Sequence, residues 1–250
     1  MNTHERLSVH NVTFYGATMT DLARYWADLG VSRLSVLDSQ LKFLQHNDYP
    51  VEAVYHLFTG PAALTRVIDA AADVGARTVY MLTGGRGSLS WEQAAQRFCE
   101  AVASCVQHAR DAGVALAIEN ASGLYADLHF AHTLRDTVTL AEMSGLDICV
   151  DIFHCWAEGD VEEMLRRALP RTRLIQLSDY VLGDRSLPGR AVPGDGTIPI
   201  ESLVAQALTN GYAHGFDLEL IGPRIEQEGR LEAARRACDV ISAMLDKLGA

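Results

Sequence analysis

Short apolar runs alternate with longer amphipathic stretches along the chain. The apolar runs are rich in Val, Ile and Leu, a composition typical of buried strands. We predict strands for residues 7–12, 33–37, 51–57, 78–82, 114–119, 148–151, 173–177 and 216–220. The stretches between them have helical periodicity, with capping signals such as Pro61 at a helix start and Ser90 before another. We predict helices for residues 20–29, 40–46, 61–74, 90–112, 130–143, 160–168, 200–208 and 226–248.

This alternation indicates βαβ units and therefore a parallel sheet. Eight such units in 250 residues predict an α/β fold of the (β/α)8 TIM barrel class. The competing arrangement is a doubly wound open sheet, which has fewer strands and a glycine-rich first turn. Here the first turn, residues 13–19, contains only Gly16. No linker or low-complexity tract interrupts the chain, so we expect residues 1–250 to form one domain.

Four of the predicted strands end on side chains that offer an oxygen atom. The runs 114–118, 148–150 and 216–218 lead into Glu119, Asp151 and Glu219. The fourth run, 174–177, has Gln176 where an apolar residue is expected. Because the active site of a barrel lies at the carboxyl ends of its strands, these four side chains are expected to meet at one rim.

Two glutamates, one aspartate and one glutamine form an all-oxygen set with three negative charges. Hard divalent cations suit such a set, whereas Zn²⁺ usually prefers nitrogen or sulfur ligands. Without a cation the carboxylates would repel one another, and at least one would tend to be protonated. The pattern therefore predicts one divalent metal ion, Mn²⁺ or Mg²⁺, with Co²⁺ as a further candidate.

Five short motifs occur in the order in which they occur in a known family. The chain resembles the xylose isomerase-like barrels, the sugar phosphate isomerases and epimerases, over nearly its whole length. That group includes ketose 3-epimerases, hydroxypyruvate isomerase, inosose dehydratase, 3-dehydroshikimate dehydratases and endonuclease IV-like proteins. The motifs are ALAIEN at 115–120, VDIFH at 150–154, LIQLSDY at 174–180, PGDGTIP at 193–199 and DLEL at 217–220.

The resemblance implies roles for the strand-end residues. Glu119, Asp151, Gln176 and Glu219 would be metal ligands, and the two glutamates would also be the catalytic acid and base. The family commonly has His at the position of Gln176, and some of its dehydratases resemble this chain in having Gln there.

The implied activity is that of a metal-dependent isomerase or epimerase acting on a sugar, a sugar phosphate or another small hydroxy-ketone. A glutamate would remove the proton beside the carbonyl, giving a metal-stabilised enediolate, and the other would return a proton. Loss of a β-hydroxyl from the same site would instead make the protein a dehydratase, a lyase acting on a cyclic hydroxy-ketone such as 3-dehydroshikimate or inosose. These residues do not indicate whether the reaction is an isomerisation or epimerisation, or a dehydration.

Other polar residues near the strand ends are candidates for binding the substrate. His154 follows Asp151 by three residues and resembles the family's contact to a substrate oxygen. Arg190 precedes the PGDG turn, where the family often has a substrate-binding arginine, and Arg185 is its competitor. Either guanidinium could hold a carboxylate or a phosphate with two hydrogen bonds. His10 and His56, on the first and third strands, could reach the pocket, although a core position is the expected role of each.

Composition narrows the classes of function. The net charge is −11 and no basic patch is visible, which argues against a nucleic-acid partner and against endonuclease IV-like repair. No apolar run reaches the roughly 18 residues of a membrane span, and the first residues do not resemble a signal peptide, so we expect a cytoplasmic protein without a membrane partner. By analogy with the family, a homodimer or homotetramer is the expected assembly. A non-catalytic, ligand-binding barrel is the remaining alternative.

Overall fold

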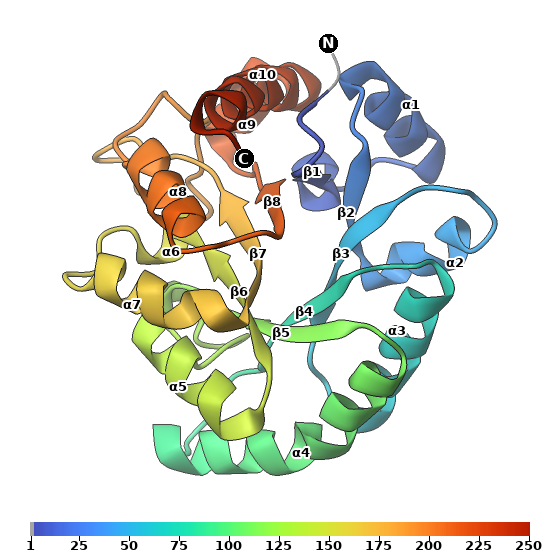
Figure 1. Cartoon of the computed structure of the whole chain (residues 1–250), viewed down its shortest axis with the longest axis vertical. Coiled ribbons are helices and arrows are strands. Elements are labelled where there is room, and N and C mark those ends of the chain that lie inside the picture. Colours follow the sequence, from blue (N-terminus) through green and yellow to red (C-terminus); the bar gives the residue numbers. More distant parts are fainter. Residues whose placement is uncertain (1–2) are drawn as a thin grey trace.

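Eight parallel strands close into a barrel in the computed structural model, which describes residues 3–250 (Figure 1). Each strand pairs with its neighbours in the sequence, and β1 closes the barrel by pairing with β8. The predicted (β/α)8 barrel is thus confirmed. The strands are β1 Leu7–His10, β2 Arg33–Leu37, β3 Val51–Leu57, β4 Thr78–Leu82, β5 Ala115–Glu119, β6 Asp147–Asp151, β7 Thr172–Leu177 and β8 Gly215–Leu218.

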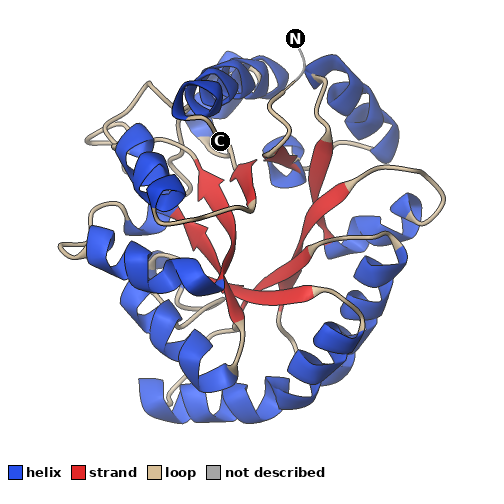
Figure 2. Cartoon of the chain, in the orientation of Figure 1, coloured by secondary structure: helices blue, strands red, loops and turns tan. Residues whose placement is uncertain are grey.

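Helices surround the strands on the outside of the barrel (Figure 2). They are α1 Met19–Leu29, α2 Leu41–Leu44, α3 Pro61–Asp73, α4 Trp91–Asp111, α5 Leu134–Ser144, α6 Ile152–Cys155, α7 Val161–Ala168, α8 Ile200–Thr209, α9 Pro223–Glu228 and α10 Arg230–Leu248. Ser90 caps α4 as expected, its hydroxyl accepting a hydrogen bond from the backbone N–H of Gln93. Within residues 3–250, no helix combines the length and the hydrophobicity that crossing a membrane requires.

Beyond shifts of a few residues at the ends of elements, two helical segments differ from the prediction. The last predicted helix, 226–248, is divided at Gly229, whose φ of 96° is incompatible with a continuous right-handed helix. The short helix α6 begins directly after β6 and was not predicted. Its N-cap is Asp151, whose Oδ1 accepts a hydrogen bond from the backbone N–H of Phe153.

The core has two parts, one on each face of the barrel wall. The larger part lies between the strands and the helices, and the smaller part lies inside the barrel. Side chains alternate between the two faces along each strand. The buried hydrophobic side chains of the interior are Ala53, Tyr80, Ala117, Cys149 and Leu174. The residues two positions further along β5, β6 and β7 therefore also point inward, at the carboxyl end of the barrel.

Candidate metal centre and active site

The inward positions at the carboxyl ends of three strands are occupied by polar side chains. Two positions beyond Ala117, Cys149 and Leu174 lie Glu119, Asp151 and Gln176. Asp151 pairs with Gln176 in the β6–β7 register, and Glu219 follows the last residue of β8. Glu119 is 5% exposed and Asp151 is fully buried. The barrel thus gathers these strand-end side chains into one buried group, as the alternation predicts.

Arg190 enters this group from the long loop after β7. Its Nη2 lies 2.6 Å from Asp151 Oδ2 and 3.1 Å from Glu219 Oε1, and its Nη1 donates to Ser178 Oγ at 3.0 Å. The guanidinium carbon also stands 4.6 Å from the centre of the Phe153 ring. A single buried guanidinium therefore compensates part of the charge of two carboxylates.

The loop that carries Arg190 is organised around a buried aspartate. Asp179 and Ala191 exchange two backbone hydrogen bonds, at 2.8 and 2.9 Å, which places Arg190 next to the end of β7. The Asp179 carboxylate holds the remainder of the loop by accepting hydrogen bonds from backbone N–H groups. Its donors are Tyr180, Gly194, Gly196 and Ile198. The PGDG motif is therefore the turn that fixes the arginine.

Gln176 presents the nitrogen of its amide to the carboxylate cluster. Its Nε2 donates to Glu219 Oε2 at 2.6 Å and to the hydroxyl of Tyr80 at 3.2 Å. Its Oε1 accepts a weak hydrogen bond from Cys149 Sγ at 3.4 Å. In this structure Gln176 orients Glu219, and coordination of a metal by its oxygen stays a prediction.

His154 lies on α6, next to Asp151. Its Nε2 is 3.6 Å from Asp151 Oδ2 and accepts a hydrogen bond from Arg190 Nη2 at 3.3 Å. An arginine can only donate, so the lone pair of His154 is on Nε2. Burial lowers the pKa of His154, which keeps the ring neutral. A neutral imidazole is the form that binds a metal or accepts a proton, and in this structure the lone pair of His154 accepts the hydrogen bond from Arg190.

Burial and mutual repulsion perturb the three carboxylates differently. Burial raises the pKa of Glu119 well above its usual value, and the charges of Glu219 and Asp151 raise it further. Burial also raises the pKa of Glu219, although Arg190 opposes the shift. Burial acts in the same direction on Asp151, but the charge of Arg190, together with the hydrogen bonds from Arg190 and the Phe153 N–H, outweighs it and the pKa of Asp151 is lowered. Asp151 is thus the most strongly ionised member, and the two glutamates are poised to take up a proton.

These carboxylates open onto a cavity of about 240 Å³. Glu119, Glu219, His154 and Arg190 all line it. Arg185 is exposed and does not line it, so of the two candidate arginines the structure brings only Arg190 to the site.

The cavity wall also contains residues that the strand-end motifs do not single out: His10, Tyr55 and Tyr80. They share one signal, which is an inward-facing position on strands β1, β3 and β4. The sequence favours a core position for His10 and leaves open that it reaches the pocket. The structure shows it both buried, with 2% exposure, and lining the cavity.

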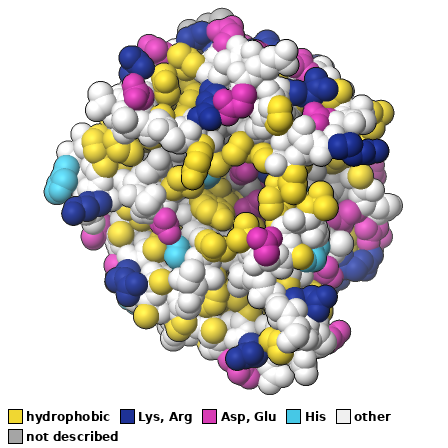
Figure 3. All heavy atoms as spheres, turned by 180° about the vertical axis from the view of Figure 1, so that it is seen from behind, with side chains coloured by type: hydrophobic (Ala, Val, Ile, Leu, Met, Phe, Trp, Pro, Cys, Tyr) yellow, Lys and Arg dark blue, Asp and Glu magenta, His cyan; other side chains and the backbone are white. Residues whose placement is uncertain are grey.

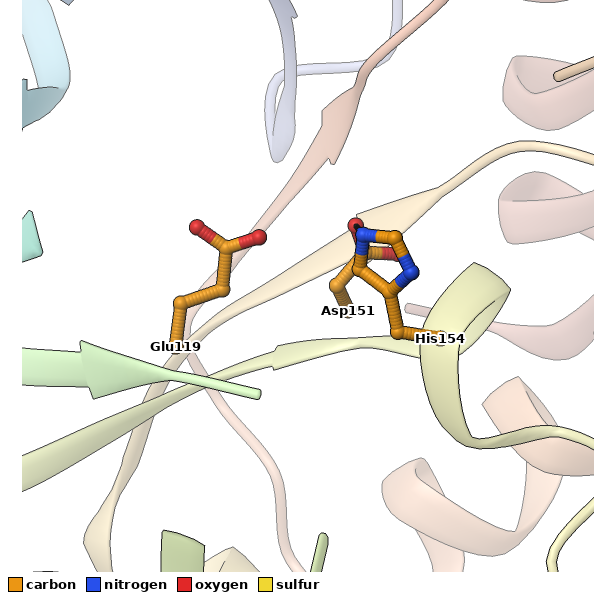
Figure 4. Close-up of side chains that lie close together, drawn as sticks. All are labelled: Glu119, Asp151 and His154. Carbon is orange, nitrogen blue, oxygen red and sulfur yellow. Dashed lines mark ion pairs between the residues drawn. The ribbon is translucent and has the colours of Figure 1, made fainter. Parts of the chain in front are cut away.

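The donor set is compatible with a divalent cation. One ligand atom each from Glu119, Asp151 and His154 lie within 4.8 Å of one another, and Figure 4 shows the Glu119 carboxylate facing the other two side chains. Within residues 3–250, the buried Glu119 carboxylate forms no side-chain hydrogen bond and no ion pair. Because a buried charge without a partner is costly, a bound cation would stabilise this carboxylate. Two oxygen donors and one nitrogen donor therefore form a possible metal site.

Comparisons with known proteins agree with this architecture. A comparison with curated protein sequences found no match. Among solved structures, the chain is similar to the D-psicose 3-epimerase of Clostridium cellulolyticum H10, crystallised with D-tagatose. The two share 15% identity and a TM-score of 0.77 over 95% of this chain and 98% of that chain. The probable 3-DHS dehydratase AsbF of Bacillus anthracis is also similar, with 13% identity and a TM-score of 0.74 over 94% and 98% of the two chains.

A third similar structure is that of the IolI protein with a binding zinc atom. It shares 14% identity with this chain and a TM-score of 0.79 over 97% of this chain and 98% of that chain. At such identities these likenesses show the common fold. The sequence profile of the xylose isomerase-like TIM barrel family matches residues 12–244, from the turn after β1 into α10. The chain therefore belongs to the xylose isomerase-like TIM barrel family.

Proposed function

We propose that this protein is a divalent-metal-dependent isomerase or epimerase that acts on a small hydroxy-ketone, such as a sugar. The observation that carries the proposal is the pair of carboxylates on one cavity, the buried Glu119 and the half-buried Glu219, beside Asp151 and His154. Such a pair supplies an acid and a base on different sides of a bound molecule. The structurally similar epimerases support the same class of reaction.

The metal would be held by Glu119, Asp151 and Glu219, with His154 or Gln176 completing the set. An oxygen-rich set favours Mn²⁺ or Mg²⁺, with Co²⁺ as a further candidate, and a nitrogen donor from His154 would also suit Zn²⁺, which the IolI structure contains. When bound, the cation would polarise the substrate carbonyl and stabilise negative charge on the neighbouring oxygens.

The residues of the chain would move the protons and hold the substrate. In the metal-free fold the pKa values of Glu119 and Glu219 are raised, so either side chain can take up a proton at the cavity. One glutamate would remove the proton beside the carbonyl and the other would return a proton to the opposite face or to the neighbouring carbon. Arg190 would donate hydrogen bonds to substrate oxygens, and His154, on the same cavity, would donate to or accept from them.

A dehydratase acting on a cyclic hydroxy-ketone is the second candidate. Gln176 favours it, because the isomerases and epimerases of the family commonly have His at this position, whereas some dehydratases have Gln. The similarity in fold to AsbF is consistent with it. In this reaction the same base would act, and the returned proton would go to a departing hydroxyl.

Incubation in D₂O with Mg²⁺ and a panel of hydroxy-ketones tests both candidates. An isomerase or epimerase would place deuterium on the carbon beside the carbonyl, detected by loss of the proton resonance. A dehydratase would produce the ultraviolet absorbance of a conjugated enone. If no compound gives either signal, the proposal is overturned. Glu219→Gln is the control, because loss of a positive signal in this variant assigns the signal to this site.

A further inference from the structure

The side chain of Asn120 extends the hydrogen bonding between β5 and β6 beyond the end of their backbone ladder. In that ladder Glu119, the last residue of β5, pairs with Cys149, and β6 continues for two more residues to Asp151. Asn120 Oδ1 accepts a hydrogen bond from the backbone N–H of Asp151 at 2.9 Å, and Asn120 Nδ2 donates to the carbonyl oxygen of Asp151 at 2.9 Å. One carboxamide therefore takes the place of a peptide group of β5.

Burial makes both hydrogen bonds of this carboxamide important. Asn120 and Asp151 are fully buried. A buried backbone N–H or carbonyl group without a partner is costly, and the carboxamide supplies an acceptor and a donor from one planar group. An aspartate anion would offer no donor to the carbonyl oxygen of Asp151, and an alanine would offer neither group. The residue type at position 120 is therefore matched to the backbone of Asp151.

The contact joins the backbones of two residues of the candidate metal centre. Glu119 directly precedes Asn120 in the sequence, so the hydrogen bonds connect the end of β5 that carries Glu119 to the end of β6 that carries Asp151. On its other side the end of β6 is held by β7, where Asp151 pairs with Gln176. Ligand atoms of Glu119, Asp151 and His154 lie within 4.8 Å of one another. The position of Asp151 relative to Glu119 therefore depends on the carboxamide of Asn120.

Asn120 acts from outside the cavity. Within residues 3–250, the side chains that line the cavity do not include Asn120, so it does not touch a molecule bound there. Figure 3, which views the molecule from the side opposite to Figure 1, shows hydrophobic side chains around a central hollow. Asn120 is fully buried and adds nothing to this surface. An effect of Asn120 on binding in the cavity therefore passes through Asp151.

We propose that Asn120 is a positioning residue of this site. Its carboxamide fixes the end of β6, so that the carboxylate of Asp151 stays beside that of Glu119 and both can bind the same divalent cation. Loss of a group that orients a metal ligand typically weakens metal binding by about 10–100-fold. This inference rests on the proposed function, because it assumes that a divalent metal binds at these carboxylates.

Titration with Mn²⁺, followed by electron paramagnetic resonance of the free ion, tests the inference. Asn120→Ala removes both hydrogen bonds and should weaken Mn²⁺ binding by about 10–100-fold with an unchanged circular dichroism spectrum. Asn11→Ala is the matched control, because Asn11 is 2% exposed and does not line the cavity. The carboxamide of Asn11 also forms one donor and one acceptor hydrogen bond at 2.9 Å, with Gln40 and Trp26. Asn11→Ala should lose stability and keep the Mn²⁺ affinity of the wild type.

Two results of this titration would overturn the inference. One is an Mn²⁺ affinity of Asn120→Ala equal to that of the wild type, and the other is an equal loss of affinity in Asn120→Ala and Asn11→Ala. If Asn120→Ala does not fold, Asn120→Ser takes its place under the same criteria, because its hydroxyl group can replace one of the two lost partners.

Thermal unfolding with and without Mn²⁺ provides a second readout, which a loss of stability alone would not change. A ligand that binds the folded state stabilises it according to its affinity. At one Mn²⁺ concentration, the rise in Tm should therefore be smaller in Asn120→Ala than in the wild type and in Asn11→Ala. Equal rises in all three proteins would contradict the inference.

The wild-type titration separates this inference from the proposed function. If the wild type binds Mn²⁺ and Asn120→Ala binds it equally well, the positioning role is wrong and the proposed metal centre is upheld. If the wild type binds no Mn²⁺, the proposed function is contradicted and the inference fails with it.

Discussion

Replacing Arg190 with methionine tests how much its buried ion pairs contribute to the stability of the protein. The guanidinium is 2% exposed and lies 2.6 Å from Asp151 Oδ2 and 3.1 Å from Glu219 Oε1. Methionine fills a similar space without charge, so Arg190→Met leaves the fully buried Asp151 carboxylate without its main cationic partner. Removal of one partner of a buried ion pair costs about 3–5 kcal/mol.

That cost translates into a large change in thermal stability. In a chain of this size each kcal/mol shifts Tm by roughly 2–4 °C, so Arg190→Met should lower Tm by about 6–20 °C in metal-free buffer. The free energy of unfolding, from urea titration followed by circular dichroism, is the direct measurement. Mg²⁺ or Mn²⁺ should recover part of the loss, because a divalent cation can also neutralise Asp151 and Glu219.

Arg167→Met is the matched control. Arg167 forms a two-point ion pair with Glu142 on the outside of the molecule, with both side chains about 45% exposed. An exposed pair of this kind contributes at most about 1 kcal/mol. If Arg190→Met in metal-free buffer lost no more stability than Arg167→Met, the reasoning about the buried pair would be refuted.

Three further predictions concern the glutamates and the loop after β7. Glu119→Gln and Glu219→Gln should each slow substrate proton exchange by about 10²–10⁴-fold with an unchanged circular dichroism spectrum, and an unaltered rate in both would remove them from the chemistry. Because the folded-state pKa of Glu119 is raised above its unfolded value, its ionisation destabilises the metal-free fold as the pH rises through the folded pKa. Glu119→Gln should therefore be more stable than the wild type at neutral pH in EDTA. The difference in unfolding free energy between the two proteins should shrink as the pH falls towards 4.5. A difference that does not depend on pH would contradict this reasoning. A Cβ on Gly196 would overlap Asp179 Oδ1, so Gly196→Ala should lower the free energy of unfolding, measured by urea titration, by about 1–3 kcal/mol. Gly159→Ala is the control and should cost less, because no atom lies within 4 Å of a Cβ at Gly159. Equal losses in the two variants would show that the turn adapts.

Much of the barrel was predictable because its signals are local. Strands buried on both faces are continuous apolar runs, and each helix between them has its own periodicity and caps. The predicted strand 33–37 and the N-cap Ser90 are confirmed at those positions. The break at Gly229 was missed because the amphipathic pattern continues across it. Only the backbone conformation at this glycine shows that the helix divides.

The candidate site was predictable to the extent that strand alternation determines it. Glu119, Asp151 and Gln176 lie where the two-residue repeat of their strands places them. The pairing of Arg190 with Asp151 spans 39 residues of sequence and depends on how the loop after β7 folds. The direction of the Gln176 amide depends on Tyr80 and Glu219, which lie on other strands or their ends. No local pattern encodes such contacts.

The metal content of the purified protein tests the central claim most directly. The wild type would be loaded with Mn²⁺, desalted and analysed by elemental mass spectrometry beside the double variant Glu119→Gln, Asp151→Asn. The account predicts about one Mn²⁺ per wild-type chain and almost none in the double variant. A wild type that retains no more Mn²⁺ than the double variant would contradict a metal centre at the ends of β5 and β6.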